Sequence, residues 1–316
     1  MRKALRLAIT GVIIIIVAFV AWMAVSFGFF DKSQRVPVLV YHDFWDKPSD
    51  DRKRLTSAAI FAAEMDYLHN NGYHVIPLKK LINYMESGES LPEKPVVITF
   101  DDGYEGNYTI AYPILKKYNM PATIFVIAGF EQFPAPEPDH SRLSWEEMRE
   151  MEASGLIDIQ AHTYDLHYKL FTDRDKTRRK PAVIARAYLF SKERRETREE
   201  YEERLYNDFL RARTTIETNL NKKVDTMAWP FGAYNDTAVR LARKAGFKYF
   251  VTTIWGLNQR GDSVEAIRRV SEKENASIEE FAKLLEPDYF YVRHFLKVID
   301  SYKDHWADTF SDTFFG

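Results

Sequence analysis

The sequence predicts an α/β fold in which a mainly parallel sheet closes into a distorted (β/α)7-type barrel, preceded by one N-terminal transmembrane helix. Strand-like apolar runs alternate with helix-like stretches, these runs number about seven, and the first 30 residues contain one long apolar segment. Alternating strands and helices are typical of parallel sheets. Seven units fit a closed or distorted barrel better than an open doubly wound sheet, although periodicity alone does not separate the two.

The expected strands are nearly continuous apolar runs, the pattern of strands that are covered on both faces. They lie at residues 36–41, 74–78, 96–100, 122–127, 156–161, 226–229 and 249–252. Capping boxes begin at Ser144, Thr197 and Ser277, each followed three residues later by Glu. Gly155 and Gly246 are expected to end helices.

The composition excludes several classes of site. With no cysteine among the 316 residues, disulfides, zinc-thiolate centres and cysteine nucleophiles are absent, so any metal must be bound by His and carboxylate side chains. The formal net charge of −2 provides no overall positive field to attract nucleic acid.

Residues 1–30 are expected to form a short cytoplasmic stub and a transmembrane anchor. Arg2, Lys3 and Arg6 precede an apolar run over residues 7–30. These 24 positions span about 36 Å as a helix, enough to cross a hydrocarbon core of about 30 Å. The charge bias places the rest of the chain outside the cytoplasm, and the alternative is a secreted protein after signal cleavage.

The remaining chain divides into a connector at residues 31–35, one large domain at 36–286 and a tail at 287–316 whose role the sequence does not reveal. Within the domain, residues 168–221 are predicted to be a charged helical insertion. Its mixed charges favour a solvated excursion. Because it directly follows residues 162–167, it could also form the wall of a binding groove.

Chemistry-bearing residues follow two of the expected strands. Residues 96–100 run into Asp101, Asp102 and Gly103, at the end of a strand where parallel α/β folds bind ligands. One carboxylate can bind a metal while the other accepts a proton; the alternative is a simple turn. His162 and His167 follow another apolar strand. Two imidazoles and a carboxylate form a common site for a catalytic divalent metal.

Two further segments are weaker. Trp229, Pro230, Phe231 and Gly232 end a strand in a turn that can direct a backbone N–H into the crevice, where it would stabilise an oxyanion; the alternative is an ordinary strand-to-helix turn. His42, followed by Asp43, ends the first strand, where a histidine could act as a general acid oriented by the carboxylate.

Together the four segments resemble the polysaccharide deacetylases, the family 4 carbohydrate esterases with a NodB-homology domain. Residues 99–103 match the family's first motif residue for residue, and His162 with His167 is similar to the second, although the usual spacing is four and here it is five. That spacing, residues 41–43 and 229–232, and the charged insertion resemble the branch acting on poly-β-1,6-N-acetylglucosamine, a biofilm exopolysaccharide. The resemblance covers residues 36–285.

The resemblance implies a role for each residue. Asp101 would be the catalytic base, and one divalent ion (zinc, nickel, cobalt or iron) would be bound by Asp102, His162 and His167. The other implied roles are His42 as acid, Asp43 as its orienting partner, the Phe231 backbone N–H at the oxyanion, and Trp229, Pro230, Tyr234 and Tyr104 toward substrate. Trp145 is a further aromatic candidate for stacking on sugar rings.

Two departures from the family pattern leave questions open. Ala228 stands where the third motif usually has an Arg that braces the catalytic base, and Arg268 or Arg269 are the candidates to replace it. No late Leu-x-His motif supplies the acid, which is why the resemblance assigns that role to His42.

The implied activity is metal-assisted hydrolysis of N-acetyl groups on an extracellular polysaccharide, with poly-β-1,6-N-acetylglucosamine as the expected substrate. The alternatives are a peptidoglycan or chitin-oligomer deacetylase and a catalytically weak polysaccharide-binding protein on the same fold. A glycoside hydrolase is disfavoured, because adjacent carboxylates do not provide two acids about 5–9.5 Å apart across a bond. The expected partners are the membrane and the machinery of exopolysaccharide synthesis or export.

Overall fold

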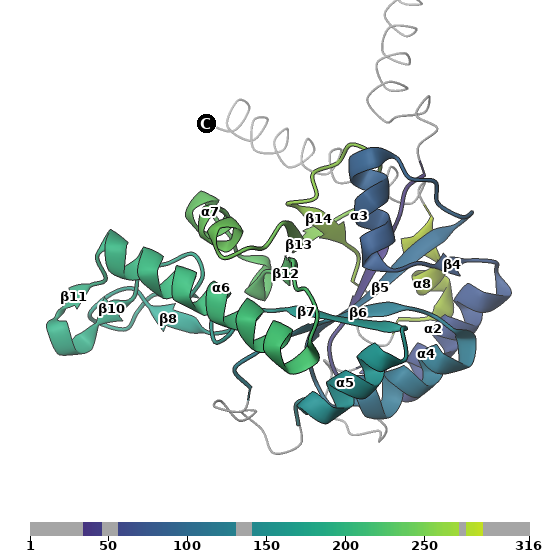
Figure 1. Cartoon of the computed structure of the whole chain (residues 1–316), viewed down its shortest axis with the longest axis horizontal. Helices are drawn as coiled ribbons and strands as arrows, with labels where there is room; N and C mark the ends of the chain where they lie inside the picture. Colours follow the sequence, from purple (N-terminus) through teal and green to yellow (C-terminus); the bar gives the residue numbers. More distant parts are fainter. Residues whose placement is uncertain (1–33, 46–55, 131–140, 272–275, 287–316) are drawn as a thin grey trace, which may run out of the picture. The chain divides into compact units, whose positions relative to one another are not determined.

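Seven parallel strands form a nearly closed ring at the centre of the protein (Figure 1). The computed structural model describes residues 34–45, 56–130, 141–271 and 276–286. In ring order the strands are β1 (Val38–Tyr41), β5 (Pro95–Asp102), β6 (Ala122–Val126), β7 (Ile157–Ala161), β12 (Thr226–Ala228), β13 (Tyr249–Trp255) and β14 (Ile267–Arg269). Val270 N donates to Val38 O at 2.8 Å, which returns the last strand to the first. The predicted α/β barrel is confirmed.

The ring differs from the sequence prediction at one strand. Residues 74–78 form only β4 (His74–Val75), which pairs with β5 outside the ring, because Pro77 ends the extended segment and caps helix α3 (Leu78–Ser87). The seventh strand is instead β14, which has two arginines in three residues and therefore lacks an apolar pattern. The ring is distorted between β7 and β12, which pair only at Ala161 and Met227.

Helices connect the strands and cover the outside of the ring. They are α2 (Ala58–Asn70), α4 (Tyr112–Tyr118) after the π-helical turn η1 (Asn107–Ala111), α5 (Trp145–Ala153), α6 (Arg198–Leu220), α7 (Asp236–Lys244) and α8 (Ile278–Leu285). The three predicted capping boxes are present at Ser144, Thr197 and Ser277. Each gives reciprocal side-chain partners to backbone N–H groups at the start of its helix.

The insertion at residues 168–221 is helical only in its second part, so this prediction was partly wrong. The first part forms two hairpins, β8 (Lys169–Phe171) with β9 (Arg179–Pro181) and β10 (Tyr188–Leu189) with β11 (Arg194–Arg195). Figure 1 shows these hairpins gathered around the N-terminal end of α6. Helix α6 buries Leu205, Phe209 and Ile216 and is a packed helix of the barrel, not a solvated excursion.

The predicted membrane anchor and the C-terminal tail lie outside the described residues. Within the four described ranges, no helix has the length and apolar character needed to span a bilayer. The domain of residues 36–286 falls within one unit, Arg35–Glu286.

Candidate active site

Polar side chains from several strands meet at the carboxyl ends of the ring. Asp101 and Asp102 end β5, His162 follows β7, Trp229 follows β12, and Arg269 ends β14. Because the strands are parallel, these ends face the same edge of the barrel, where ligand sites of such folds are found. The two segments predicted most strongly, those of Asp101–Asp102 and His162, therefore lie at the expected edge of the barrel.

Asp101 forms a buried bidentate ion pair with Arg269. Arg269 Nη1 donates to Asp101 Oδ1 at 2.7 Å and Nη2 donates to Oδ2 at 2.6 Å, and both side chains are almost fully buried. Burial raises the pKa of Asp101, but the Arg269 guanidinium, together with His162 and His42, outweighs this effect and holds the pKa below its usual range. Asp101 is therefore ionised at neutral pH, with both oxygens fixed in place.

Of the two candidates to brace Asp101, Arg268 and Arg269, the structure shows that Arg269 makes the contact. Its Nε donates to the Thr252 carbonyl oxygen at 2.9 Å, which fixes the guanidinium plane toward Asp101. Arg268 points elsewhere, with Nη1 at 3.1 Å from Asp262 Oδ2. Successive side chains of a strand lie on opposite faces, so only one of the two arginines can reach the interior.

Asp102, His162 and His167 converge on one point. Asp102 Oδ1 lies 3.4 Å from His162 Nε2 and 3.3 Å from His167 Nε2, and the three atoms all lie within 4.8 Å of one another. Asp102 Oδ1 is buried, and the described part of the chain offers it no hydrogen-bond donor. A buried acceptor without a donor, facing two imidazole nitrogens, fits a divalent cation.

The state of both imidazoles suits metal binding. His162 Nδ1 lies 2.9 Å from the Ala228 carbonyl oxygen, so this nitrogen carries the proton and Nε2 presents its lone pair to the site. Burial and the neighbouring His162 lower the pKa of His167 to about 4, so His167 is neutral at pH 7. Zinc and other divalent transition metals bind neutral imidazole.

The turns that carry these ligands have unusual backbone geometry. Asp102 and Thr163 both lie at positive φ, 72° and 69°. Residues other than glycine adopt this region at a cost, which is common where a fold fixes functional side chains. Arg142 supports the first turn by donating from Nη1 to the Asp102 carbonyl oxygen at 2.7 Å. Its guanidinium also lies 3.9 Å from the centre of the half-buried Tyr104 ring.

Asp208 on α6 is a functional candidate that the sequence did not reveal. Its Oδ1 accepts the backbone N–H of Tyr164 at 3.0 Å and its Oδ2 that of Asp165 at 2.8 Å. These residues lie in the loop that joins the histidines His162 and His167. Burial raises the pKa of Asp208 to about 7. The signal was absent from the sequence because Asp208 lies more than 40 residues beyond that loop, in a helix rich in charge.

Replacing Asp208 with Ala is expected to loosen this loop. One buried and one partly buried N–H group would lose their acceptors, at about 1–3 kcal/mol for the first and about 1 kcal/mol for the second, so the free energy of unfolding should fall by about 2–4 kcal/mol. Zinc affinity should also fall, by about 10–100-fold, because the loop orients both histidines. Denaturant unfolding of the metal-free protein and zinc titration measure the two effects. Asp208→Asn retains one acceptor and should lose less; a fully stable Ala variant would contradict the assignment.

His42 and Asp43 follow β1 at the same edge. His42 is exposed, and its backbone carbonyl accepts a hydrogen bond from Asn107 Nδ2 at 2.7 Å. Asp43 is buried, and its Oδ1 accepts the backbone N–H of Phe44 at 2.8 Å. A positive charge on His42 would help to lower the pKa of Asp101, after the larger effects of Arg269 and His162, so His42 lies within electrostatic reach of the proposed base. The orienting role of Asp43 toward His42 stays a prediction.

The third segment behaves differently from its prediction at Trp229. The Trp229 side chain is fully buried between the rings of Tyr234 and Phe250, at centroid distances of 5.8 and 5.0 Å, so it cannot stack on a sugar. Pro230 and Trp145 are also buried. The sequence alone does not distinguish a sugar-binding tryptophan from a core residue, and Trp229 is a core residue.

Phe231 is the exposed aromatic of this turn. It is 45% exposed, has φ of 57°, and its ring centre lies 4.4 Å from that of His167. Lys169 Nζ lies over the Phe231 ring, 5.4 Å from its centre. Phe231 therefore borders the metal-ligand cluster. Tyr234 is half-buried beside Trp229, so of the predicted aromatic contacts Phe231, Tyr104 and Tyr234 retain exposed surface.

A parallel barrel that holds two histidines and an aspartate beside a buried Asp–Arg pair has the features of a candidate metal-dependent hydrolase. The chain belongs to the polysaccharide deacetylase family: the family model described as polysaccharide deacetylase matches residues 88–250, more than half of the chain. The resemblance predicted from the motifs is confirmed.

The chain is similar in sequence and structure to several named deacetylases. The chain is 29% identical over 252 residues to the poly-beta-1,6-N-acetyl-D-glucosamine N-deacetylase of Escherichia coli, covering 77% of this chain and 37% of that relative. It is 28% identical over 208 residues to the Staphylococcus aureus enzyme of the same name, covering 65% and 63%. A solved de-N-acetylase from Aggregatibacter actinomycetemcomitans aligns with a TM-score of 0.69 at 31% identity, covering 79% and 100%. The matched region thus spans little more than a third of the E. coli relative.

Proposed function

We propose that this protein is a metal-dependent N-deacetylase that removes part of the acetyl groups from poly-β-1,6-N-acetylglucosamine. The observation that carries the proposal is the convergence of Asp102, His162 and His167 on one point beside the Asp101–Arg269 pair. The choice of glycan is supported by the names of the E. coli and S. aureus relatives.

In the proposed reaction, Asp102, His162 and His167 hold one divalent ion. When bound, such an ion polarises a carbonyl oxygen and lowers the pKa of water. Asp101 accepts the proton of the water that attacks the acetamide carbon, and Arg269 keeps Asp101 ionised for that step. His42 donates a proton to the departing nitrogen as the C–N bond breaks. The products are acetate and a glucosamine unit with a free amine.

Asp101→Asn separates the proposed base from the metal ligands. The side-chain amide is nearly the same size but cannot accept the proton, so turnover should fall by about 10²–10⁴-fold. Zinc content should stay the same, because the three ligands are unchanged. Acetate release and metal analysis of the same preparation measure both. Near-full activity in this variant would remove Asp101 from the role of base.

His42→Ala is expected to slow the reaction by about 100-fold or more without removing metal. A general acid must be protonated, so the wild-type rate should fall on the alkaline side of its pH profile and the variant should lose that limb. His69→Ala is a matched control, since His69 is an exposed histidine on α2. A variant with an unaltered profile would exclude His42 as the acid.

The substrate is tested by acetate release from β-1,6- and β-1,4-linked N-acetylglucosamine oligomers, with and without a chelator. We expect chelator-sensitive release from the β-1,6-linked oligomers. Preference for β-1,4-linked oligomers would support a peptidoglycan or chitin-oligomer deacetylase instead. Binding of either oligomer without acetate release would support the polysaccharide-binding alternative.

The proposed location is the cell membrane, with residues 7–30 as anchor and the barrel outside the cytoplasm. The length and charge flanks of the N-terminal segment support it. This position would bring the barrel close to machinery that synthesises or exports the polysaccharide. Full-length protein should sediment with membranes, whereas a chain that begins at residue 31 should not. If cells that express the full chain release a shortened protein into the medium, a cleaved signal would be favoured instead.

A further inference from the structure

The hairpin module, defined as residues 168–197, has a charge opposite to that of the rest of the chain. It contains ten Lys and Arg residues and only four Asp and Glu, a net charge of +6. The whole chain has 44 basic and 46 acidic residues, so the remainder carries 34 basic against 42 acidic. A local excess of this size on an acidic protein produces a positive patch that attracts anions.

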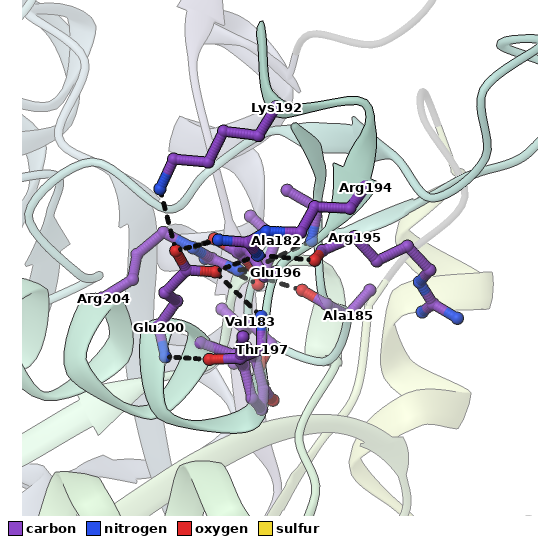
Figure 2. A network of polar contacts seen from close by, with 12 residues as sticks. Ala182, Val183, Ala185, Lys192, Arg194, Arg195, Glu196, Thr197, Glu200 and Arg204 are labelled. Carbon is purple, nitrogen blue, oxygen red and sulfur yellow. Dashed lines mark hydrogen bonds and ion pairs between the residues drawn. The ribbon is translucent and has the colours of Figure 1, made fainter. Parts of the chain in front are cut away.

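Two of the module's four carboxylates, Asp175 and Glu193, are exposed and lie away from the cavity described below, whereas Glu196 and the neighbouring Glu200 are engaged by basic side chains. Glu196 is buried and accepts Arg204 Nε at 2.8 Å, Arg204 Nη2 at 2.9 Å and the Ala187 backbone N–H at 2.8 Å. Glu200 at the start of α6 pairs with Lys192 and with both Nη atoms of Arg194. Figure 2 shows this network, with the Arg195 guanidinium turned away from both carboxylates.

Asp173 is engaged by its own hairpin turn. Its Oδ1 accepts the backbone N–H groups of Thr177 and Arg178, both at 3.1 Å, and its Oδ2 contacts the Thr177 hydroxyl. The nearest Arg178 nitrogen lies 4.0 Å from the carboxylate. Asp173 therefore offsets at most one of the surrounding positive charges.

Four of the module's basic residues line a cavity of about 430 Å³ between the hairpins. Arg178, Lys180, Arg186 and Arg195 contribute to its wall, and Asp173 is its one acidic lining residue. Among the described residues, the side chains of Lys180, Arg186 and Arg195 have no carboxylate within ion-pair distance. Arg186 is half-buried, so its charge is held in the wall and is less hydrated than on an open surface.

The walls of the cavity are fixed by backbone pairing. The β8–β9 hairpin pairs Leu170 with Lys180, and the β10–β11 hairpin pairs Tyr188 with Arg195. Arg204 donates to the carbonyl oxygens of Ala182 and Ala185, which holds the segment between the hairpins against α6. The basic side chains thus project from a framework that exists before any ligand binds, which lowers the entropy cost of binding.

We propose that this cavity binds a phosphate group carried by a ligand separate from the acetylated glycan. Four cations against one engaged carboxylate leave an excess that a dianionic phosphate neutralises better than a single carboxylate. Arg guanidinium groups also donate in pairs to phosphate oxygens, and three arginines line the wall. The volume admits a phosphate together with an attached polyol or sugar. The proposal does not depend on the deacetylase activity.

The test is calorimetric titration of the full chain with two probes at 0.15 M salt. Inorganic pyrophosphate represents a free phosphate ligand, and water-soluble dihexanoyl phosphatidic acid, a phosphomonoester, represents a lipid headgroup, with the zwitterionic phosphatidylcholine analogue as its comparison of zero net charge. We expect binding of at least one anionic probe, weakened about tenfold or more in the double variant Lys180→Gln, Arg186→Gln. Whichever probe shows this dependence identifies the source of the phosphate group.

A matched control separates the cavity from diffuse charge. The double variant Arg174→Gln, Lys176→Gln removes the same charge from the same module but from exposed residues that do not line the cavity. It should bind the probe about as well as the wild type. Equal weakening in both double variants, or no binding of either anionic probe by the wild type, would overturn the proposal. Unchanged thermal unfolding of both variants ensures that a loss of binding is not a loss of fold.

Discussion

Replacing His162 or Asp102 with Ala is expected to abolish both metal retention and acetate release. Each variant removes one of the three proposed ligands, whose atoms lie within 4.8 Å of one another, so the two that remain could not hold a divalent ion tightly. Because the ion supplies the activation of carbonyl and water, turnover should fall to the background rate. Elemental analysis after dialysis, with acetate release from the same samples, measures both losses.

The matched control for this prediction is His74→Ala. His74 is an exposed histidine whose Nδ1 lies 2.7 Å from the Glu93 carbonyl oxygen, outside the ligand cluster. Its loss should change neither metal content nor turnover. Treating the wild type with a chelator should reproduce the His162 result, and adding back zinc, nickel, cobalt or iron in turn should show which ions restore the rate. A His162→Ala protein that keeps a full equivalent of metal would place the ion elsewhere.

The convergence of Asp102, His162 and His167 could be predicted because its signals are local. Asp101 and Asp102 directly follow an apolar strand, His162 directly follows another, and parallel strands bring their carboxyl ends to one edge. The motif spacing supplied the rest. None of these inferences requires knowing which residues contact one another across the barrel.

The supporting residues could be predicted only in part, because their contacts are long-range: Arg269 was one of two candidates for the brace, and Asp208 was not among the candidates. Arg269 lies 168 residues beyond Asp101, in a three-residue strand whose two arginines give no sign of a barrel strand. Asp208 reaches the histidine loop from a helix in which it is one charge among many. The predicted substrate contact of Trp229 was wrong for a different reason. Its sequence context suggested a site, but the ring fills the core between Tyr234 and Phe250.

Fold prediction succeeded and failed on similar grounds. Long apolar runs such as residues 96–100 became fully buried strands, and capping boxes began helices where expected. Residues 74–78 carried the same apolar character, but Pro77 has φ of −60° and opens a helix, which limits the strand to two residues. The hairpin module lacked any apolar period because two of its four short strands, β9 and β11, are mostly exposed and basic, so the sequence could not separate it from the helix that follows.

Arg269→Met is expected to lower the free energy of unfolding by about 3–5 kcal/mol. The substitution leaves the Asp101 carboxylate buried without its partner, and an uncompensated buried charge costs far more than a lost surface contact. Guanidinium unfolding of chelator-treated protein measures the effect without a contribution from bound metal. Arg268→Met is the matched control, because Arg268 pairs with Asp262 in a partly exposed position and should cost about 1 kcal/mol or less.

The double variant Asp101→Leu, Arg269→Met decides whether the cost arises from the unpaired charge. Replacing both partners of a buried pair with apolar side chains is often nearly neutral, so the double variant should regain most of the stability that Arg269→Met loses. It should remain inactive, since it lacks the proposed base, while keeping its metal because Asp102, His162 and His167 are intact. The single variant Asp101→Leu completes the comparison. If the stability losses of Asp101→Leu and Arg269→Met simply added up to that of the double variant, the Asp101–Arg269 contact would contribute no coupling free energy. Arg269 would then act by filling space and not by holding the carboxylate ionised.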